Sequence, residues 1–159
     1  MALIIRTPSV EELPGLSDLC FRSKAVWGYD EHFMNACRRE LSFTAQDLEL
    51  THIGVAEQHG KILGVVQVKV SHDDADLLKL FVEPQLVRRG TGRALFGWAA
   101  EISGRMGARR MIIDADPNAA PFYREMGACD SGKAPSGSIP GRMLPRLTLD
   151  CRASRSCAP

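Results

Sequence analysis

The stretch PQLVRRGTGRALFGWAAEI, from Pro84 to Ile102, places Gly90 and Gly92 after a pair of arginines and at the start of an amphipathic helix pattern. Glycine lets the backbone come close to a ligand, and the first turn of a helix has N–H groups without partners inside the helix. Such a helix start attracts anions, so we expect a phosphate-binding turn that holds a diphosphate. A plain strand-to-helix turn with solvated arginines is the alternative. The cations next to the glycines are Arg88, Arg89 and Arg93.

Two well-known phosphate loops do not fit this stretch. A dinucleotide-binding fingerprint requires a third glycine at the position of Leu95. A Walker A loop built on Gly92 and Gly97 requires Lys and then Ser or Thr, where the chain has Trp98 and Ala99. The prediction of a diphosphate site therefore rests on the helix start and not on either motif.

Length and composition set the broad class. The 159 residues predict one domain over residues 1–150, followed by a flexible tail over 151–159. With 45% hydrophobic residues and a net charge of +1, nothing indicates binding to nucleic acid or to a membrane. The first residues lack a signal-peptide pattern, so we expect a cytoplasmic protein with reduced cysteines. The histidines and cysteines lack the spacing of zinc ligands, and no metal is expected.

The order of the apolar patterns predicts the architecture. Short apolar or alternating runs predict strands, and runs with helical period predict helices, in the order β-α-α-β-β-β-α-β-α-β-β. This order indicates an α/β fold with a mixed central sheet and helices on both faces. Within it we expect a second helix from Asp30 to about Leu41, close packing at Gly97, and an edge or bulge position for Pro145. The predicted buried stripe of the central helix is Ala94, Leu95, Trp98, Ala99, Ile102 and Met106.

Residues 77–128, from LLKLFVEP through RRGTGRAL to NAAPFYREMGA, resemble the GNAT family of N-acetyltransferases. The element order of the N-terminal half also matches this family, and SKAVWGYDEHFM resembles a bacterial subgroup of generic acetyltransferases. The glycine loop departs from the family pattern at two positions. Val87 stands where the family usually has Gln or Arg, and Arg88 stands where relatives often have glycine. Because main-chain N–H groups make most diphosphate contacts in such loops, we still expect the cofactor to bind.

The resemblance implies the GNAT fold, acetyl-coenzyme A as acyl donor, and direct transfer of the acetyl group to a primary amine. It also implies, by family habit, a homodimer with the last strand near the subunit contact. The acceptor's identity stays open, from polyamine to protein lysine. The cofactor-binding residues implied are Leu80, Phe81, Val82, Val87, Arg88, Arg89, Gly90, Thr91, Gly92, Arg93, Asn118 and Tyr123.

The resemblance also implies catalytic roles. Tyr123 matches the usual general acid, which would protonate the leaving thiolate, while a packed core tyrosine is the alternative. Asp76 matches an acidic position that serves some relatives as general base, often through water; a solvated turn carboxylate is the alternative. Glu83 is a second candidate base. Asn118 matches a cofactor contact and could also cap the following helix.

The segment between the first two helices is the expected acceptor side. Trp27 and Tyr29 could form an aromatic wall that stacks on a cationic amine, or could cover the core. Glu31 or His32 could reach the cleft from this segment. If they line the cleft, Asp30, Glu31 and Asp76 would favour a positively charged acceptor. Two other functions stay open: a non-catalytic acyl-coenzyme A-binding module, and a plain nucleotide-binding domain.

Overall fold

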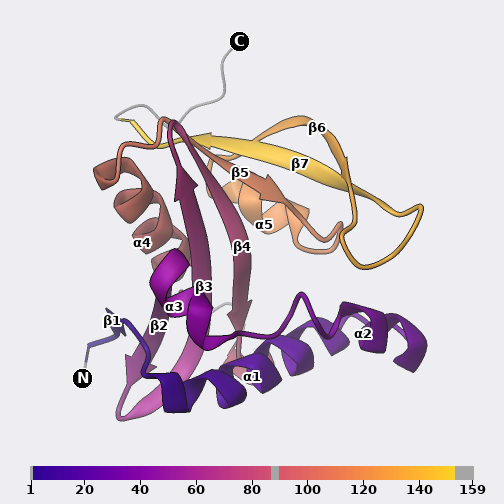
Figure 1. The fold of residues 1–159 in the computed structure, drawn as a ribbon, viewed down its shortest axis with the longest axis horizontal. Coiled ribbons are helices and arrows are strands. Elements are labelled where there is room, and N and C mark those ends of the chain that lie inside the picture. Colours follow the sequence, from indigo (N-terminus) through magenta and orange to yellow (C-terminus); the bar gives the residue numbers. More distant parts are fainter. Residues whose placement is uncertain (1, 87–89, 153–159) are drawn as a thin grey trace.

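The computed structural model describes residues 2–86 and 90–152, which form one seven-stranded mixed sheet (Figure 1). The strand order across the sheet is β1-β2-β3-β4-β5-β7-β6. β4 and β5 run parallel, and every other neighbouring pair is antiparallel. The strands are β1 (Ile4–Arg6), β2 (His52–Gln58), β3 (Lys61–Ser71), β4 (Asp74–Val82), β5 (Arg110–Asp114), β6 (Cys129–Pro135) and β7 (Met143–Asp150).

Helices cover both faces of this sheet, which confirms the predicted fold class. A capping box of Ser9 and Glu12 starts a short 3-10 helix that leads into the first α-helix. Gly28, with φ of +89°, lies in the turn after this helix and directs the chain toward the next one. The α-helices are α1 (Leu13–Ala25), α2 (Glu31–Cys37), α3 (Ala45–Leu50), α4 (Thr91–Arg105) and α5 (Ala120–Glu125).

Two hydrophobic cores lie on opposite faces of the sheet. The consecutive residues Val65 and Val66 of β3 belong to different cores, as the alternation of side chains along a strand requires. The first core packs α4 and α5 against β3, β4, β5 and β7. The second packs α1 and α2 against β2 and β3. The sheet is therefore fixed from both sides.

The buried stripe of α4 differs from the predicted one. Met106 lies after the helix end and is 56% exposed, so its predicted burial is wrong. The prediction of close packing at Gly97 is also wrong, because a Cβ there would have no neighbour within 4 Å. The close approach is made by glycines of the sheet: a Cβ on Gly64 would lie 2.9 Å from Leu95 Cδ1. The buried residues of α4 are Thr91, Leu95, Phe96, Ala99, Ala100 and Ser103.

Three further local expectations need correction. The second helix ends at Cys37 and not near Leu41, and α3 is absent from the predicted order of elements. The strand that holds Pro145 lies between β5 and β6, so an edge position is wrong. A register shift does occur in the neighbouring strand β6, between Asp130 and Gly132. The Pro145 carbonyl accepts a hydrogen bond from the N–H of Ala115 just beyond β5.

Candidate active site

β4 and β5 pair over only three residues each, and the last recorded pair is Asp76 with Ile112. Beyond it β4 continues to Val82 alongside β3, so the two parallel strands diverge. The Glu83 N–H donates to the Leu63 carbonyl at 2.8 Å, toward β3. Because N–H groups alternate in direction along a strand, those of Leu80 and Val82 point toward the gap between β4 and β5. Backbone donors thus face an opening in the middle of the sheet.

The N-terminus of α4 lies at the end of this gap. Gly90 is its N-cap and has φ of +85°, a left-handed conformation that favours glycine. A Cβ on Gly92 would lie 3.4 Å from the Phe122 ring and 3.8 Å from Val82, so the first turn sits between β4 and α5. The N–H groups of this turn have no acceptor inside the helix. Three residues of the predicted loop, Val87, Arg88 and Arg89, lie outside the described residues.

Tyr123 packs beside that helix start. Its ring lies 5.8 Å from the ring of Phe96 and 5.3 Å from that of Phe122, in tilted and edge-on arrangements. The side chain is buried, and among the described residues its hydroxyl has no hydrogen-bond partner. Burial, together with the nearby charge of Asp116, raises the pKa of the phenol above its usual value. The phenol therefore stays protonated at neutral pH and has a proton to donate.

The two candidate bases have different surroundings. Asp76 is half-buried where β4 and β5 diverge, and burial with the charges of Asp114 and Asp74 raises its pKa. A raised pKa favours uptake of a proton near neutral pH. Glu83 instead accepts from Arg22 Nη2 at 2.6 Å, so its carboxylate already has a cationic partner.

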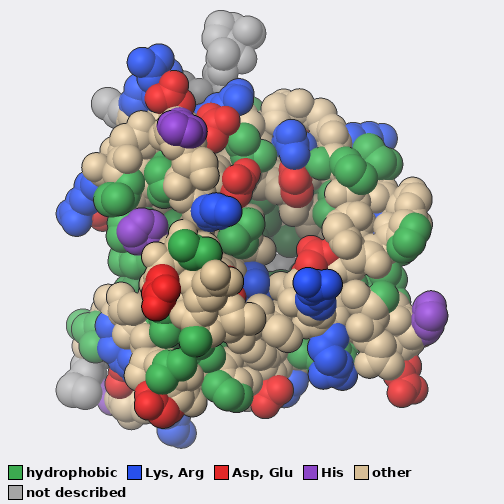
Figure 2. Space-filling view, viewed as in Figure 1, with side chains coloured by type: hydrophobic (Ala, Val, Ile, Leu, Met, Phe, Trp, Pro, Cys, Tyr) green, Lys and Arg blue, Asp and Glu red, His purple; other side chains and the backbone are tan. Residues whose placement is uncertain are grey.

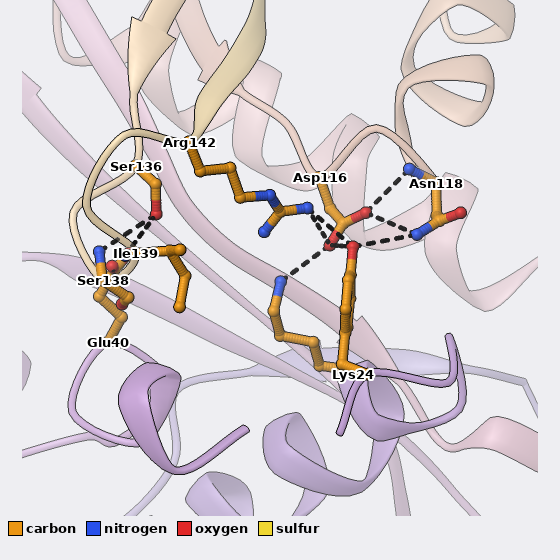
Figure 3. Close-up of polar contacts among 9 residues, drawn as sticks. Lys24, Glu40, Asp116, Asn118, Ser136, Ser138, Ile139 and Arg142 are labelled. Carbon is orange, nitrogen blue, oxygen red and sulfur yellow. Dashed lines mark hydrogen bonds and ion pairs between the residues drawn. The ribbon is translucent and has the colours of Figure 1, made fainter. Parts of the chain in front are cut away.

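A polar cluster of four partly buried side chains and the exposed Asn118 joins segments that are far apart in the sequence (Figure 3). Asp116, just after β5, accepts at Oδ2 from Lys24 Nζ at 2.9 Å and from the Tyr29 hydroxyl at 2.8 Å. Its Oδ1 accepts from the Asn118 N–H at 2.8 Å and from Asn118 Nδ2 at 3.0 Å. The Tyr29 oxygen also accepts from Arg142 Nη2 at 2.7 Å and from Asn118 Nδ2 at 3.1 Å. We call these five residues the Asp116 network.

The ionisation of the Asp116 network follows from these contacts. Burial opposes the charge of Asp116, but the hydrogen bonds from Lys24, the Asn118 backbone and Tyr29 outweigh it and lower its pKa. Burial and the bond to Asp116 raise the pKa of the Tyr29 phenol, which is therefore neutral. The Tyr29 ring stacks on Phe33 with centroids 3.9 Å apart.

The structure places the remaining predicted site residues as follows. Asn118 contacts Asp116 and Tyr29, and the helix N-cap is Ala119. Trp27 is 48% exposed, and Glu31 and His32 are exposed in the first turn of α2. Lys24, Asp116 and Arg142 were not predicted as site residues. A signal existed only for Asp116, which stands two residues after β5 and before Pro117 and Asn118.

The loop between β6 and β7 completes the surroundings of the gap. Ser138 donates a hydrogen bond to Glu40, which follows α2, and Arg142 from the same loop reaches the Asp116 network (Figure 3). In the space-filling view the surface is hollowed near its centre, between β4, β5, the β6–β7 loop and the α1–α2 segment (Figure 2). Side chains of both charge signs surround this hollow. We call it the central cleft.

Within residues 2–86 and 90–152, no group of three or more His, Cys, Asp or Glu side chains is placed to hold a metal ion. In the same residues, the helices are too short or too polar to span a bilayer.

Residues 49–127 match the family model described as acetyltransferase (GNAT) domain. A PaiA N-acetyltransferase from Thermoplasma acidophilum, in complex with coenzyme A, has 19% identity and a TM-score of 0.78, over 94% of this chain and 99% of that one. A GCN5-related N-acetyltransferase from Rhodopseudomonas palustris has 22% identity and a TM-score of 0.76, over 94% and 96%. The ribosomal-protein-S18-alanine N-acetyltransferase from Escherichia coli has 19% identity and a TM-score of 0.67, over 99% and 97%. No curated protein matches the sequence significantly.

Proposed function

Because the chain belongs to the GNAT acetyltransferase family, we propose that it transfers an acetyl group from acetyl-coenzyme A directly to a primary amine. One observation carries this proposal: the first turn of α4 lies at the open end of the β4–β5 gap, beside Tyr123 and its neighbour Phe122. A diphosphate at the helix start and a thioester in the gap would then belong to one extended ligand.

The residues present fit such a ligand. The N–H groups of Thr91, Gly92 and Arg93 are donors for the diphosphate, and the helix dipole favours its negative charge. The N–H groups of Leu80 and Val82 face the gap and can bind the carbonyls of the pantetheine arm or polarise the thioester oxygen. All of these donors are main-chain N–H groups. Binding of the ligand therefore does not require the Gln or Arg side chain that relatives have at the position of Val87.

The chemistry needs a neutral amine and a protonated leaving group. At pH 7 an alkyl ammonium with a pKa of about 10.4 costs roughly 4–5 kcal/mol to deprotonate, so a base assists the attack. In our proposal Asp76 accepts this proton, directly or through water, in preference to Glu83, whose carboxylate is paired with Arg22. Tyr123 gives its proton to the coenzyme A thiolate as the C–S bond breaks.

We also propose the setting in which the protein works. Residues 1–150 act as one domain in the cytoplasm, and neither nucleic acid nor a membrane is a partner. A homodimer would use β6, the outer strand of the sheet, more readily than β7, which is paired on both sides.

The test is thiol release from acetyl-coenzyme A over a panel of amines, with Tyr123→Phe as the comparison. The variant keeps the packed ring, so we expect an unchanged affinity for acetyl-coenzyme A and a kcat lower by about 10²–10⁴-fold. If acetyl-coenzyme A binds but no amine gives turnover, and the variant behaves like the wild type, the chain is a non-catalytic acyl-coenzyme A-binding module. Stronger thermal stabilisation by ATP or NAD than by acetyl-coenzyme A would indicate a nucleotide-binding domain instead.

A further inference from the structure

Resting on the proposed acetyl transfer, we propose that the acceptor amine carries a carboxylate, and that Arg142 binds this carboxylate in the central cleft with support from Lys24. The charges of the Asp116 network do not balance. Lys24 and Arg142 are two cations, and Asp116 is the single carboxylate with which both form ion pairs. Because the Tyr29 phenol is neutral, the network has one uncompensated positive charge.

The acceptors inside the network are already used. Each oxygen of Asp116 accepts two hydrogen bonds, which fills the capacity of a carboxylate. The Tyr29 oxygen accepts two more. Arg142 consequently stands 3.6 Å from Asp116 Oδ2, at ion-pair distance but without a hydrogen bond to it. The carboxylate of Asp116 and the phenol oxygen of Tyr29 therefore have no acceptor site left to offer Arg142.

Arg142 retains most of its N–H donors. Its Nη2 donates to Tyr29, and among the described residues no other group accepts from the guanidinium. The side chain is only 19% exposed, so water compensates its charge incompletely. The nearby Glu40 accepts from Ser138 at the other end of the loop. A carboxylate matches the planar fork of a guanidinium and would supply both the missing charge and the missing acceptors.

The guanidinium is also held in place before a ligand arrives. Its central carbon lies 5.2 Å from the centroid of the Tyr29 ring and 4.9 Å from that of Phe33. Those stacked rings also have Lys24 Nζ within 5.4 and 5.9 Å. Such contacts fix the direction of a cation and leave its remaining donors free. Tyr29, one of the two aromatic residues expected to stack on a cationic acceptor, thus already has cations of the protein on its ring.

The network is close to the reacting groups. The Asp116 carbonyl accepts from the N–H groups of Ala119 and Ala120 at 2.8 and 3.0 Å, and the Ala119 carbonyl accepts from the Tyr123 N–H at 3.4 Å, so one helical turn joins the network to Tyr123. The segments that supply the network also border the central cleft (Figures 1 and 2). Of the three acidic residues expected to favour a cationic acceptor, Asp30 accepts from the N–H of Phe33 as the α2 cap, Glu31 is exposed, and Asp76 is the proposed base. The acceptor class is therefore amino acids and related amino-carboxylates.

The experiment measures binding and turnover separately. Calorimetry in the presence of coenzyme A compares the binding of four N-acetylamino acids with that of their α-carboxamides. The four acids are N-acetylglycine, N-acetylleucine, N-acetylphenylalanine and N-acetylglutamate. These probes resemble the product, and each pair differs only in the α-carboxylate; the glutamate amide keeps its side-chain carboxylate and shows whether a displaced carboxylate can bind. Arg142→Gln removes the guanidinium, and Arg105→Gln, on an exposed i,i+4 pair with Glu101, is the matched control. Thiol release is then followed with the free amino acids and their amides.

We expect at least one carboxylate probe to bind the wild type and the Arg105→Gln variant about tenfold or more tightly than its amide. The preference should fall below about twofold in Arg142→Gln. Equal binding of acid and amide by the wild type, binding of neither, or a preference that survives Arg142→Gln overturns the proposal. The wild-type comparison stands even if Arg142→Gln fails to fold. Carboxylate-selective binding without thiol release from any amine supports the anion site and contradicts acetyl transfer.

Discussion

At the scale of single residues, Asp76 is a carboxylate whose surroundings oppose its charge. Burial and the neighbouring carboxylates raise its folded-state pKa above the unfolded value. This group therefore contributes stability below its unfolded pKa, and that contribution is lost as the pH rises through the folded pKa. We expect Asp76→Asn to raise the unfolding midpoint at pH 7 by up to about 2 °C, with a gain that disappears near pH 3. The same change should lower kcat/KM by roughly 10²-fold or more.

Asp74 provides the control with the opposite sign. A hydrogen bond from Arg110 lowers its pKa, so Asp74 contributes stability above its unfolded pKa and loses it as the pH falls through the folded pKa. Asp74→Asn should therefore lower the midpoint slightly at pH 7, have no effect at low pH, and reduce turnover far less than Asp76→Asn. A loss of stability at neutral pH in Asp76→Asn, measured by thermal denaturation across the pH range, would contradict the account of Asp76.

At the scale of elements, two glycines of α4 should respond to alanine in opposite directions. Gly90 has φ of +85°, so Gly90→Ala introduces left-handed strain of about 1–2 kcal/mol at the helix start. Gly97 lies inside the helix, and a Cβ at this position would have no atom within 4 Å. Gly97→Ala should therefore stabilise the protein by about 0.5–1 kcal/mol. Urea denaturation measures both free energies of unfolding.

The two alanine variants also distinguish an effect on helix stability from an effect on ligand binding. Only Gly90→Ala should weaken binding of acetyl-coenzyme A, because only Gly90 sets the geometry of the first-turn N–H groups. Calorimetric titration would contradict this account if Gly97→Ala weakened binding as much, or if both variants shifted stability in the same direction.

Local patterns are sufficient to predict most elements and the sheet class. The strands β2 to β5 stand out because apolar runs end at turns or at Pro84, and α4 because its period is helical over fifteen residues. The incorrect predictions also have local causes. α3 has only six residues, although Thr44 and Asp47 form a capping box that could have marked its start. The low helix propensity of glycine suggested close packing at Gly97, but the close contact is made by Gly64 in the sheet, which the helix sequence alone does not reveal.

At the scale of the whole molecule, the Asp116 network could not be predicted because its members come from α1, the α1–α2 segment, the β5–α5 turn and the β6–β7 loop. No sequence spacing relates Lys24 to Arg142; only the folded sheet brings them to one carboxylate. Through the ion pair between Lys24 and Asp116, the network connects α1, which packs in the second core, to the turn after β5. Because α1 also packs against β4, the network provides a side-chain link between β4 and β5 beyond their last backbone pair, Asp76 with Ile112.

Removing the carboxylate of the network should consequently weaken the whole fold. Asp116→Asn leaves Lys24 and Arg142 without their counter-ion at 13% and 19% exposure, so we expect a loss of about 2–4 kcal/mol in the free energy of unfolding at pH 7. Because Asp116 has a lowered folded pKa, its contribution is present above the unfolded pKa and is lost as the pH falls through the folded one. The difference from the wild type should therefore shrink in acid. Asp130→Asn, at an exposed pair with Arg124, should change the free energy of unfolding by less than about 0.5 kcal/mol. Equal losses in Asp130→Asn and Asp116→Asn would show that the network does not link α1 to the turn after β5.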